Sequence, residues 1–151
     1  MKNILINNEK ELYTKCTDMT PHEIVKNKKI VYDVLDTFIN FEHCIGVGLA
    51  ANQIGYTKRF IVISESSKVS SLFTMINPLI VNHGRDIVYE DEMCLSYPNR
   101  KENIGRYRVI TVEYYNANWE KKIEVFKGYV ARIIQHEVDH LNGRDCLKNR
   151  L

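Results

Sequence analysis

The segment that most constrains the fold lies close to the end of the chain. Residues 127–143 carry apolar side chains at helical spacing and end with Gly143, a residue type common just past a helix C-terminus. The apolar positions are Val130, Ile133, Ile134, Val138 and Leu141. Because they form a single stripe, a helix here must bury that stripe against other elements. We therefore expect a central helix over residues 127–143.

The same helix carries the sequence QHEVDH, with two histidines and a carboxylate beside the apolar stripe. His136 and His140 are four residues apart and lie along one border of the stripe, within reach of a single divalent ion. Glu137 falls near the middle of the stripe, where an uncompensated carboxylate is costly. Two histidines around a buried glutamate favour a hydrolytic metal centre over two structural core histidines. Gln135 and Asp139 are expected to point the other way.

A catalytic metal centre usually takes three protein ligands and leaves one position to water or substrate. Cys94 is the leading candidate for the third ligand, because it follows an acidic run at residues 90–92 and precedes a polar turn that ends at Pro98. The residue types alone leave Asp91 and Glu92 open as alternatives. The sequence therefore predicts two ligands directly and restricts the third to a short segment.

The cysteine pattern agrees with a reducing compartment. No two cysteines form a C-x-x-C pair, so neither a redox motif nor a disulfide framework is indicated. Apart from Cys94, we interpret the cysteines as small buried or half-buried residues. They are Cys16, Cys44 and Cys146.

The composition is that of an ordinary globular protein. The 151 residues are 44% hydrophobic and 26% charged, which predicts a single domain over residues 1–151. With the metal centre on its central helix, this would be a single catalytic domain. A formal net charge of +2 gives no reason to expect nucleic acid or an anionic membrane as a partner. The N-terminus has no signal-peptide pattern and no stretch is apolar enough to span a membrane, so we expect a cytoplasmic protein.

The rest of the chain predicts one more long helix and several strands. A helix over residues 20–40 is indicated by an N-cap threonine, a proline at the first helical position and a glutamate three residues past the cap. Runs of β-branched and aromatic residues predict strands at residues 59–63, 72–77 (ended by Pro78), 79–81, 109–115 and 120–126. We expect an α+β fold, with mostly antiparallel strands packed around the central C-terminal helix, plus an N-terminal helix.

Three blocks of the sequence, taken together, resemble the signature motifs of one enzyme family. They read GVGLAANQ at residues 46–53, EMCLS at residues 92–96 and QHEVDHL at residues 135–141. In this order and at these separations they are similar to the motifs of bacterial-type peptide deformylase, in a short form without a long C-terminal helix. The resemblance covers most of the chain. It implies a metal-dependent hydrolase that removes the formyl group from the N-terminal formyl-methionine of nascent peptides.

The resemblance also implies a role for each motif residue. Glu137 is implied to be the general acid/base, while Gln53 and the backbone N–H of Leu95 bind the formyl oxygen as it becomes an oxyanion. The implied metal ligands are Cys94, His136 and His140. The implied cofactor is one divalent transition metal, Fe²⁺ in the cell, for which Zn²⁺, Ni²⁺ or Co²⁺ can substitute.

The resemblance further implies where the substrate lies. Gly46 and Gly48 would let the peptide run alongside the backbone of the first motif as an added strand. A methionine side chain needs an apolar pocket; Val47 and Ile133 are its expected walls, and His136 is part of its floor. The implied partners are formyl-methionyl nascent peptides, with transient ribosome contact and no direct binding to nucleic acid or membranes.

Some positions depart from the family pattern or leave a choice open. Met93 stands where the second motif usually has glycine, so the metal-binding loop and the substrate rim are expected to differ. Arg100 and Lys101 compete for the role of an arginine that reaches the substrate backbone. Arg106 is a candidate partner for Asp139, and a surface ion pair worth under ~1 kcal/mol is an equally good interpretation.

Two other functions remain as alternatives. A zinc endopeptidase of the H-E-x-x-H class would take its third ligand after His140, where Asp145 and Cys146 are the only candidates. A catalytically impaired, deformylase-like binding protein would have lost activity through Met93 and an altered rim. Release of formate from a formyl-methionyl peptide separates these alternatives from a working deformylase.

Overall fold

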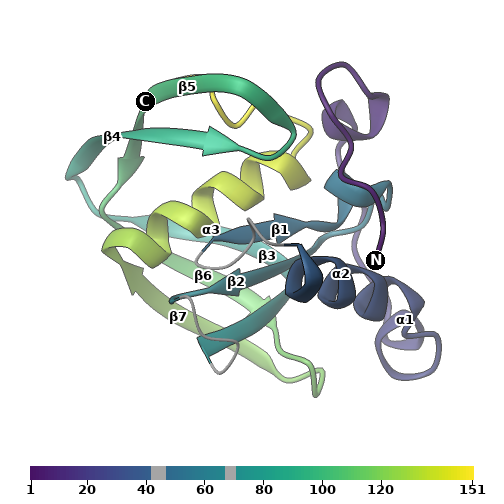
Figure 1. The fold of residues 1–151 in the computed structure, drawn as a ribbon. Helices are drawn as coiled ribbons and strands as arrows, with labels where there is room; N and C mark the ends of the chain where they lie inside the picture. Colours follow the sequence, from purple (N-terminus) through teal and green to yellow (C-terminus); the bar gives the residue numbers. More distant parts are fainter. Residues whose placement is uncertain (42–46, 67–70) are drawn as a thin grey trace.

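The computed structural model describes residues 1–41, 47–66 and 71–151, and it has two layers of strands with a helix between them (Figure 1). The larger layer is an antiparallel sheet in the order β1-β2-β3-β6-β7. Its strands are β1 (Gly48–Ala50), β2 (Phe60–Ser64), β3 (Leu72–His83), β6 (Val109–Tyr115) and β7 (Lys121–Lys127). The smaller layer is an antiparallel pair, β4 (Ile87–Cys94) and β5 (Tyr97–Tyr107).

Helix α3 (Gly128–Leu141) is the predicted central helix, and it lies between the two layers (Figure 1). It ends at Leu141, and Gly143 follows two residues later, as predicted, with a φ of +66°, the left-handed conformation common just past a helix C-terminus. Its apolar stripe joins the main core, which includes buried residues of β2, β3 and β6. The expected α+β fold, with antiparallel strands around the C-terminal helix, is confirmed.

The side of α3 that carries Gln135 and Asp139 is also buried, which the stripe did not predict. The two residues are only 7% and 8% exposed, because β5 covers them. Gln135 accepts a hydrogen bond from the backbone N–H of Tyr107 (3.0 Å) and donates one to its carbonyl (2.8 Å). Asp139 pairs with Arg106. Of the two interpretations of that pair, the exposed surface pair is therefore wrong.

The predicted N-terminal helix is broken in two. Helix α1 (Pro21–Val25) starts as expected, with a capping box between Thr20 and Glu23. Helix α2 (Lys29–Asn40) follows after three residues, KNK. Asparagine is a weaker helix former than lysine, and the closely spaced lysines repel one another, which accounts for the interruption. The apolar face of α2 packs with residues of β1 and β2 in a second core cluster.

Strand β3 continues through Pro78, where the sequence predicts that a strand ends. Asn77 has a φ of +53°, and the pairing with β6 shifts register between Ile76 and Leu79. A bulge thus accommodates the proline, which has no N–H to donate to the sheet. The two predicted strands on either side of Pro78 are one strand.

The β4–β5 pair forms where the sequence predicts no strands, only an acidic run and a turn. Only Glu92 and Cys94 are buried in β4, so the alternation of buried and exposed residues that identifies a strand is missing. The short 3₁₀ helices η1 (Lys10–Tyr13) and η2 (Ala51–Ile54) complete the elements. Within the described ranges, every helix is too short or too polar to cross a bilayer.

Candidate metal centre

Side chains from β4, α3 and the segment after α3 converge on one point. The ligand atoms of Cys94, His136, His140 and Cys146 all lie within 4.8 Å of one another. The Sγ atom of Cys94 is 3.2 Å from Nε2 of His140. The three residues that the resemblance implies as ligands are thus brought together, and Cys146 joins them.

The local structure explains how Cys94 reaches this point. Successive residues of a strand point to opposite faces, so at the end of β4 Cys94 is 8% exposed while Met93 is 72% exposed. His136 and His140 lie one turn apart on α3, with ring centroids separated by 5.3 Å. The side-chain amide of Asn52, in η2, donates a hydrogen bond of 2.6 Å to the carbonyl of His140. The end of α3 is therefore tied to the first motif.

The surroundings of Cys94 favour its thiolate form. A hydrogen bond from Cys146 lowers the pKa of the Cys94 thiol well below its usual value. Burial acts in the opposite direction, and the nearby imidazole of His140 lowers the pKa further. Burial and the neighbouring Cys94 sulfur raise the pKa of the Cys146 thiol. A buried thiolate between imidazoles is a strong ligand for a divalent transition metal.

Glu92, one of the alternatives for the third ligand, supports a ligand instead. Its Oε1 lies 2.8 Å from Nδ1 of His136, which leaves Nε2 of that ring to face the cluster. Burial alone would raise the pKa of Glu92, but hydrogen bonds from His136 and Arg106 lower it to about 2. Asp91, the other alternative, is exposed and pairs with Lys101. Neither carboxylate belongs to the cluster of ligand atoms.

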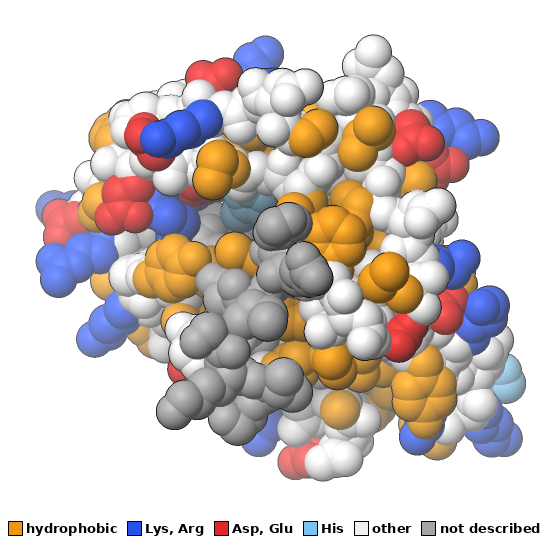
Figure 2. Space-filling model, in the orientation of Figure 1, with side chains coloured by type: hydrophobic (Ala, Val, Ile, Leu, Met, Phe, Trp, Pro, Cys, Tyr) orange, Lys and Arg blue, Asp and Glu red, His pale blue; other side chains and the backbone are white. Residues whose placement is uncertain are grey.

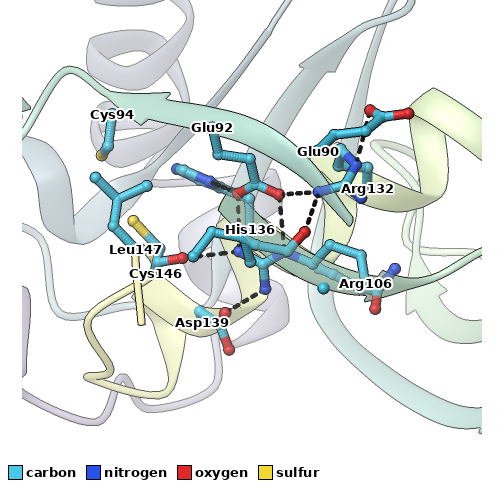
Figure 3. A network of polar contacts seen from close by, with 12 residues as sticks. Glu90, Glu92, Cys94, Arg106, Arg132, His136, Asp139, Cys146 and Leu147 are labelled. Atoms are coloured by element: carbon cyan, nitrogen blue, oxygen red, sulfur yellow. Dashed lines mark hydrogen bonds and ion pairs between the residues drawn. The ribbon is translucent and has the colours of Figure 1, made fainter. Parts of the chain in front are cut away.

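Two buried arginines hold Glu92 in place (Figure 3). Arg106 donates to both oxygens of the carboxylate, at 3.0 and 2.9 Å, and Arg132 donates to one at 2.6 Å. Arg106 also bonds Asp139, so the four side chains form one network, each with 12% exposure or less. The sequence predicted only the contact between Arg106 and Asp139. The available signal for Arg132 was its position one turn before His136 on α3.

Glu137 lies against the first motif. A Cβ atom built on Gly48 would come within 2.7 Å of Cγ of Glu137, so only glycine leaves room for this side chain. Burial raises the pKa of Glu137, although the imidazoles of His136 and His140 partly oppose the shift. Its Oε2 is buried and, among the described residues, has no hydrogen-bond partner. An unpartnered buried carboxylate oxygen at a cavity wall is suited to handling a proton.

Gln53, in η2, is buried beside the cluster. Its Oε1 accepts a hydrogen bond from the backbone N–H of Ala50 (3.0 Å), which fixes the amide plane. Its Nε2 is 3.7 Å from Sγ of Cys94 and 3.1 Å from Oγ of Ser96. The amide therefore presents its donor side to the cluster. Leu95 lies half-buried in the turn between β4 and β5, directly after Cys94.

Comparison with known proteins agrees with this geometry. The family model described as polypeptide deformylase matches residues 1–150. The chain belongs to the peptide deformylase family. A peptide deformylase from Clostridium beijerinckii is 43% identical over 124 residues, which cover 80% of this chain and 85% of that protein. One from Wolbachia sp. subsp. Brugia malayi is 36% identical over 150 residues, covering 93% and 82%.

Solved deformylase structures have the same fold. The Met-Ala-Ser-bound class I type b peptide deformylase from Acinetobacter baumannii superposes with a TM-score of 0.85, at 28% identity, over 95% of this chain and 94% of that one. The enzyme from Thermotoga maritima gives a TM-score of 0.83 at 32% identity, over 95% and 93%. Family membership makes the chain an enzyme that removes formyl groups from nascent peptides. The two alternatives, a zinc peptidase and a binding protein, gain no support.

Deformylases use a divalent metal ion, and the residues present fit one. Two imidazoles and a thiolate are the donor types that hold transition metals, and their ligand atoms are close enough to share an ion. Oε2 of Glu137, which has no hydrogen-bond partner within the described part of the chain, is free to contact a further polar group at the same place. The identity of the ion does not follow from this donor set, because Fe²⁺, Zn²⁺, Ni²⁺ and Co²⁺ all accept it.

A cavity of about 260 Å³ opens beside the deformylase cluster. Its lining includes Val47, Gly48, Met93, Ile133, His136 and Glu137. On the face drawn in Figure 2, a histidine lies near the middle, with apolar side chains around it. A larger cavity of about 530 Å³ is lined by none of the predicted site residues. The smaller cavity is therefore the candidate substrate site.

The remaining sequence predictions concern the rim of this cavity. Met93 is in the lining, as expected for a side chain in the place of the family glycine. Arg100 pairs with Asp145 (2.8 Å) on the side of β5 next to the chain end, and Lys101 pairs with Asp91. Neither lines the cavity. Gly46 lies outside the described residues.

Proposed function

We propose that this deformylase hydrolyses the formyl group of N-terminal formyl-methionine at the cluster formed by Cys94, His136 and His140. The observation that carries the proposal is the convergence of these side chains with Glu137 at the wall of one cavity. Sulfur and nitrogen donors, a buried carboxylate with a raised pKa and an amide donor together meet the needs of metal-assisted amide hydrolysis.

The ion would be held by Sγ of Cys94 and by one ring nitrogen each from His136 and His140. When bound, it would supply Lewis-acid chemistry, which lowers the pKa of a water molecule and polarises a carbonyl. We propose Fe²⁺ as the ion in the cell, with Zn²⁺, Ni²⁺ or Co²⁺ as substitutes. The hydrogen bond between Glu92 and Nδ1 of His136 supports the assignment of His136 as a ligand, because it orients the ring with Nε2 toward Cys94.

Glu137 would move the proton. Its carboxylate takes a proton from the attacking water and passes it to the leaving amine as the C–N bond breaks, which releases formate and the free N-terminus. A pKa raised by burial brings this group closer to the working pH, where one residue can act as base and then as acid. Gly48 leaves the space in which the side chain sits.

Gln53 and the backbone N–H of Leu95 would bind the formyl oxygen. Nε2 of Gln53 has two hydrogens and already lies next to Cys94, so a substrate oxygen in the cavity can replace one of its present contacts. One such donor typically contributes about 10²–10³ to kcat. The fixed position of the amide, held by Ala50, favours stabilisation of the transition state over the bound substrate.

The substrate would be a formyl-methionyl nascent peptide. Val47 and Ile133 would contact the methionine side chain, with His136 below it, and Gly46 and Gly48 would pair with the peptide backbone as an added strand. The cramped space beside Glu137 suits the smallest acyl group. We further propose that the protein works in the cytoplasm, with only transient contact to the ribosome.

The test is release of formate from formyl-Met-Ala-Ser by anaerobically purified, iron-loaded protein. Glu137→Gln should keep one ion per chain and lose about 10²–10⁴-fold in turnover, because only proton transfer is removed. Cys94→Ala should lose the ion. Glu120→Gln, at an exposed position, is the matched control and should behave as the unmodified protein does.

Two outcomes would contradict the proposal. One is the absence of formate above a chelator-treated control when one ion per chain is bound. The other is equal loss of the ion in Glu137→Gln and Cys94→Ala, which would make Glu137 a ligand and remove its separate role.

A further inference from the structure

Cys146 is the one member of the cluster that the three deformylase motifs do not contain. It follows α3 by five residues, and its side chain is fully buried in a small core with Cys94, Tyr97 and Leu147. Figure 3 shows the side chains of Cys94 and Cys146 directed toward each other, one from β4 and one from the segment after α3.

The backbone around Cys146 is held by hydrogen bonds from two arginine side chains. Arg106, which also holds Glu92, donates a hydrogen bond of 2.9 Å to the carbonyl of Cys146. Arg100 donates one of 3.2 Å to the carbonyl of Leu147 and pairs with Asp145 at 2.8 Å. The two arginines of β5 therefore fix the position of Cys146 relative to the histidines of α3.

Cysteine burial alone does not bring a sulfur to this place. Cys16 is also buried, at 4% exposure, but it lies in the main core, and its Sγ approaches the carbonyl of Thr14 at 3.8 Å. Among the described cysteines, only Cys94 and Cys146 share a cluster with histidines. Cys16 therefore serves as a matched control for Cys146.

The donor set has the composition of a closed metal site. Two cysteines and two histidines around one ion form a tetrahedral site with no position left for solvent. With metal–sulfur distances of about 2.3 Å and metal–nitrogen distances of about 2.0–2.1 Å, the ligand atoms of a tetrahedral site lie roughly 3.3–3.8 Å apart. Ligand atoms within 4.8 Å of one another must approach by up to roughly 1–1.5 Å to meet this condition, which side-chain rotations can supply.

We propose that Cys146 is a fourth protein ligand of the metal centre in the substrate-free enzyme. Together with Cys94, His136 and His140 it closes the centre, and it must leave before substrate can enter. The proton of Cys146 passes to solvent when its sulfur binds, since a coordinating thiol is deprotonated. The inference rests on the proposed function for the other three ligands and adds a closed resting state to it.

The test counts sulfur atoms around bound zinc. Zinc-loaded protein without substrate is measured by X-ray absorption spectroscopy after one zinc per chain has been confirmed. We expect two sulfur ligands per zinc in the unmodified protein, one in Cys146→Ala and two in Cys16→Ala. A single sulfur per zinc in the unmodified protein would overturn the proposal, and that measurement needs no variant to fold.

A second readout is zinc affinity, measured by competition with a chromogenic chelator. Losing a ligand should weaken binding by at least about 10-fold in Cys146→Ala, at the lower end of what even indirect partners of a metal contribute. Cys16→Ala should bind as the unmodified protein does, and unchanged affinity in Cys146→Ala would count against ligation. Formate release by the iron-loaded protein tests the proposed function separately, so either hypothesis can fail alone.

Discussion

On one face of α3, Ala131, Ile134 and Leu141 are fully buried against the five-stranded sheet. On the other face, Arg132 and Asp139 are nearly as buried, at 6% and 8% exposure, beneath the β4–β5 pair. The first face is apolar, and its contribution to stability comes from close packing that leaves no cavity. The second is charged and depends on each group having its partner, since a buried charge without one is costly. The metal ligands lie where the two faces meet.

The difference shows how the fold separates stability from chemistry. The sheet side supplies non-directional burial, which tolerates substitutions of similar volume. The β4–β5 side supplies directional contacts that orient His136 through Glu92 and Arg106. Variants on the two faces should therefore fail in different ways.

Arg106→Met should have the largest effect on the charged face. It leaves Asp139 buried without its ion pair and removes the donor to both oxygens of Glu92. We expect a loss of about 3–5 kcal/mol in the free energy of unfolding, measured by urea denaturation. Arg108→Met, at an exposed position two residues away, should change it by less than about 0.5 kcal/mol. Equal effects of the two substitutions would mean that the buried network does not stabilise the fold.

Ile134→Ala tests the apolar face. The side chain is fully buried between α3 and the sheet, so truncation leaves a cavity and should cost about 2–5 kcal/mol. Ile134→Val, which removes one methylene group, should cost about 0.5–1.5 kcal/mol. A loss of unfolding free energy that grows with the volume removed, measured by urea denaturation, would show that this face stabilises the fold by filling space. A similar loss in both variants would instead indicate that the packing of α3 on the sheet requires the shape of isoleucine at this position.

Acid should weaken the charged face through Glu92. An unfolded glutamate titrates near pH 4.3, whereas hydrogen bonds from His136 and Arg106 hold the pKa of folded Glu92 at about 2. Between about pH 2 and pH 4.3, Glu92 is protonated in the unfolded chain but ionised in the folded protein. The stabilising contribution is therefore complete above about pH 4.3 and is lost as the pH falls toward 2. Urea denaturation across this window should show a shallower pH dependence for Glu92→Gln, and an unchanged one for Glu65→Gln at the surface.

Lys29→Met should have the smallest effect. Lys29 pairs with Asp33 one turn later on α2 at 2.9 Å, but its side chain is 66% exposed. Solvent and salt screen such a pair, so the urea midpoint should stay within experimental scatter. A shift as large as that of Arg106→Met would show that burial is not what distinguishes the two ion pairs.

Several elements could be predicted from the sequence because their signals are local. The stripe and the terminal glycine of α3, the capping box at Thr20 and the alternation in β6 all act within a few residues. The two strands of the β4–β5 pair were missed for the opposite reason. Their residues are mostly exposed, and what holds β4 and β5 together is mutual pairing and the arginines beneath them.

The sequence by itself determined the family, the central helix and the residue types of a metal centre, because these are encoded in short contiguous motifs. Only the tertiary structure decided what surrounds that centre. Glu92 supports His136, Asp139 is buried beneath Arg106, and Cys146 joins the ligands. Glu92 and His136 are 44 positions apart and Arg106 and Asp139 are 33 apart, and these contacts form only when the β4–β5 pair docks on α3. No local sequence pattern predicts such contacts, since their stability depends on burial that all the elements create together.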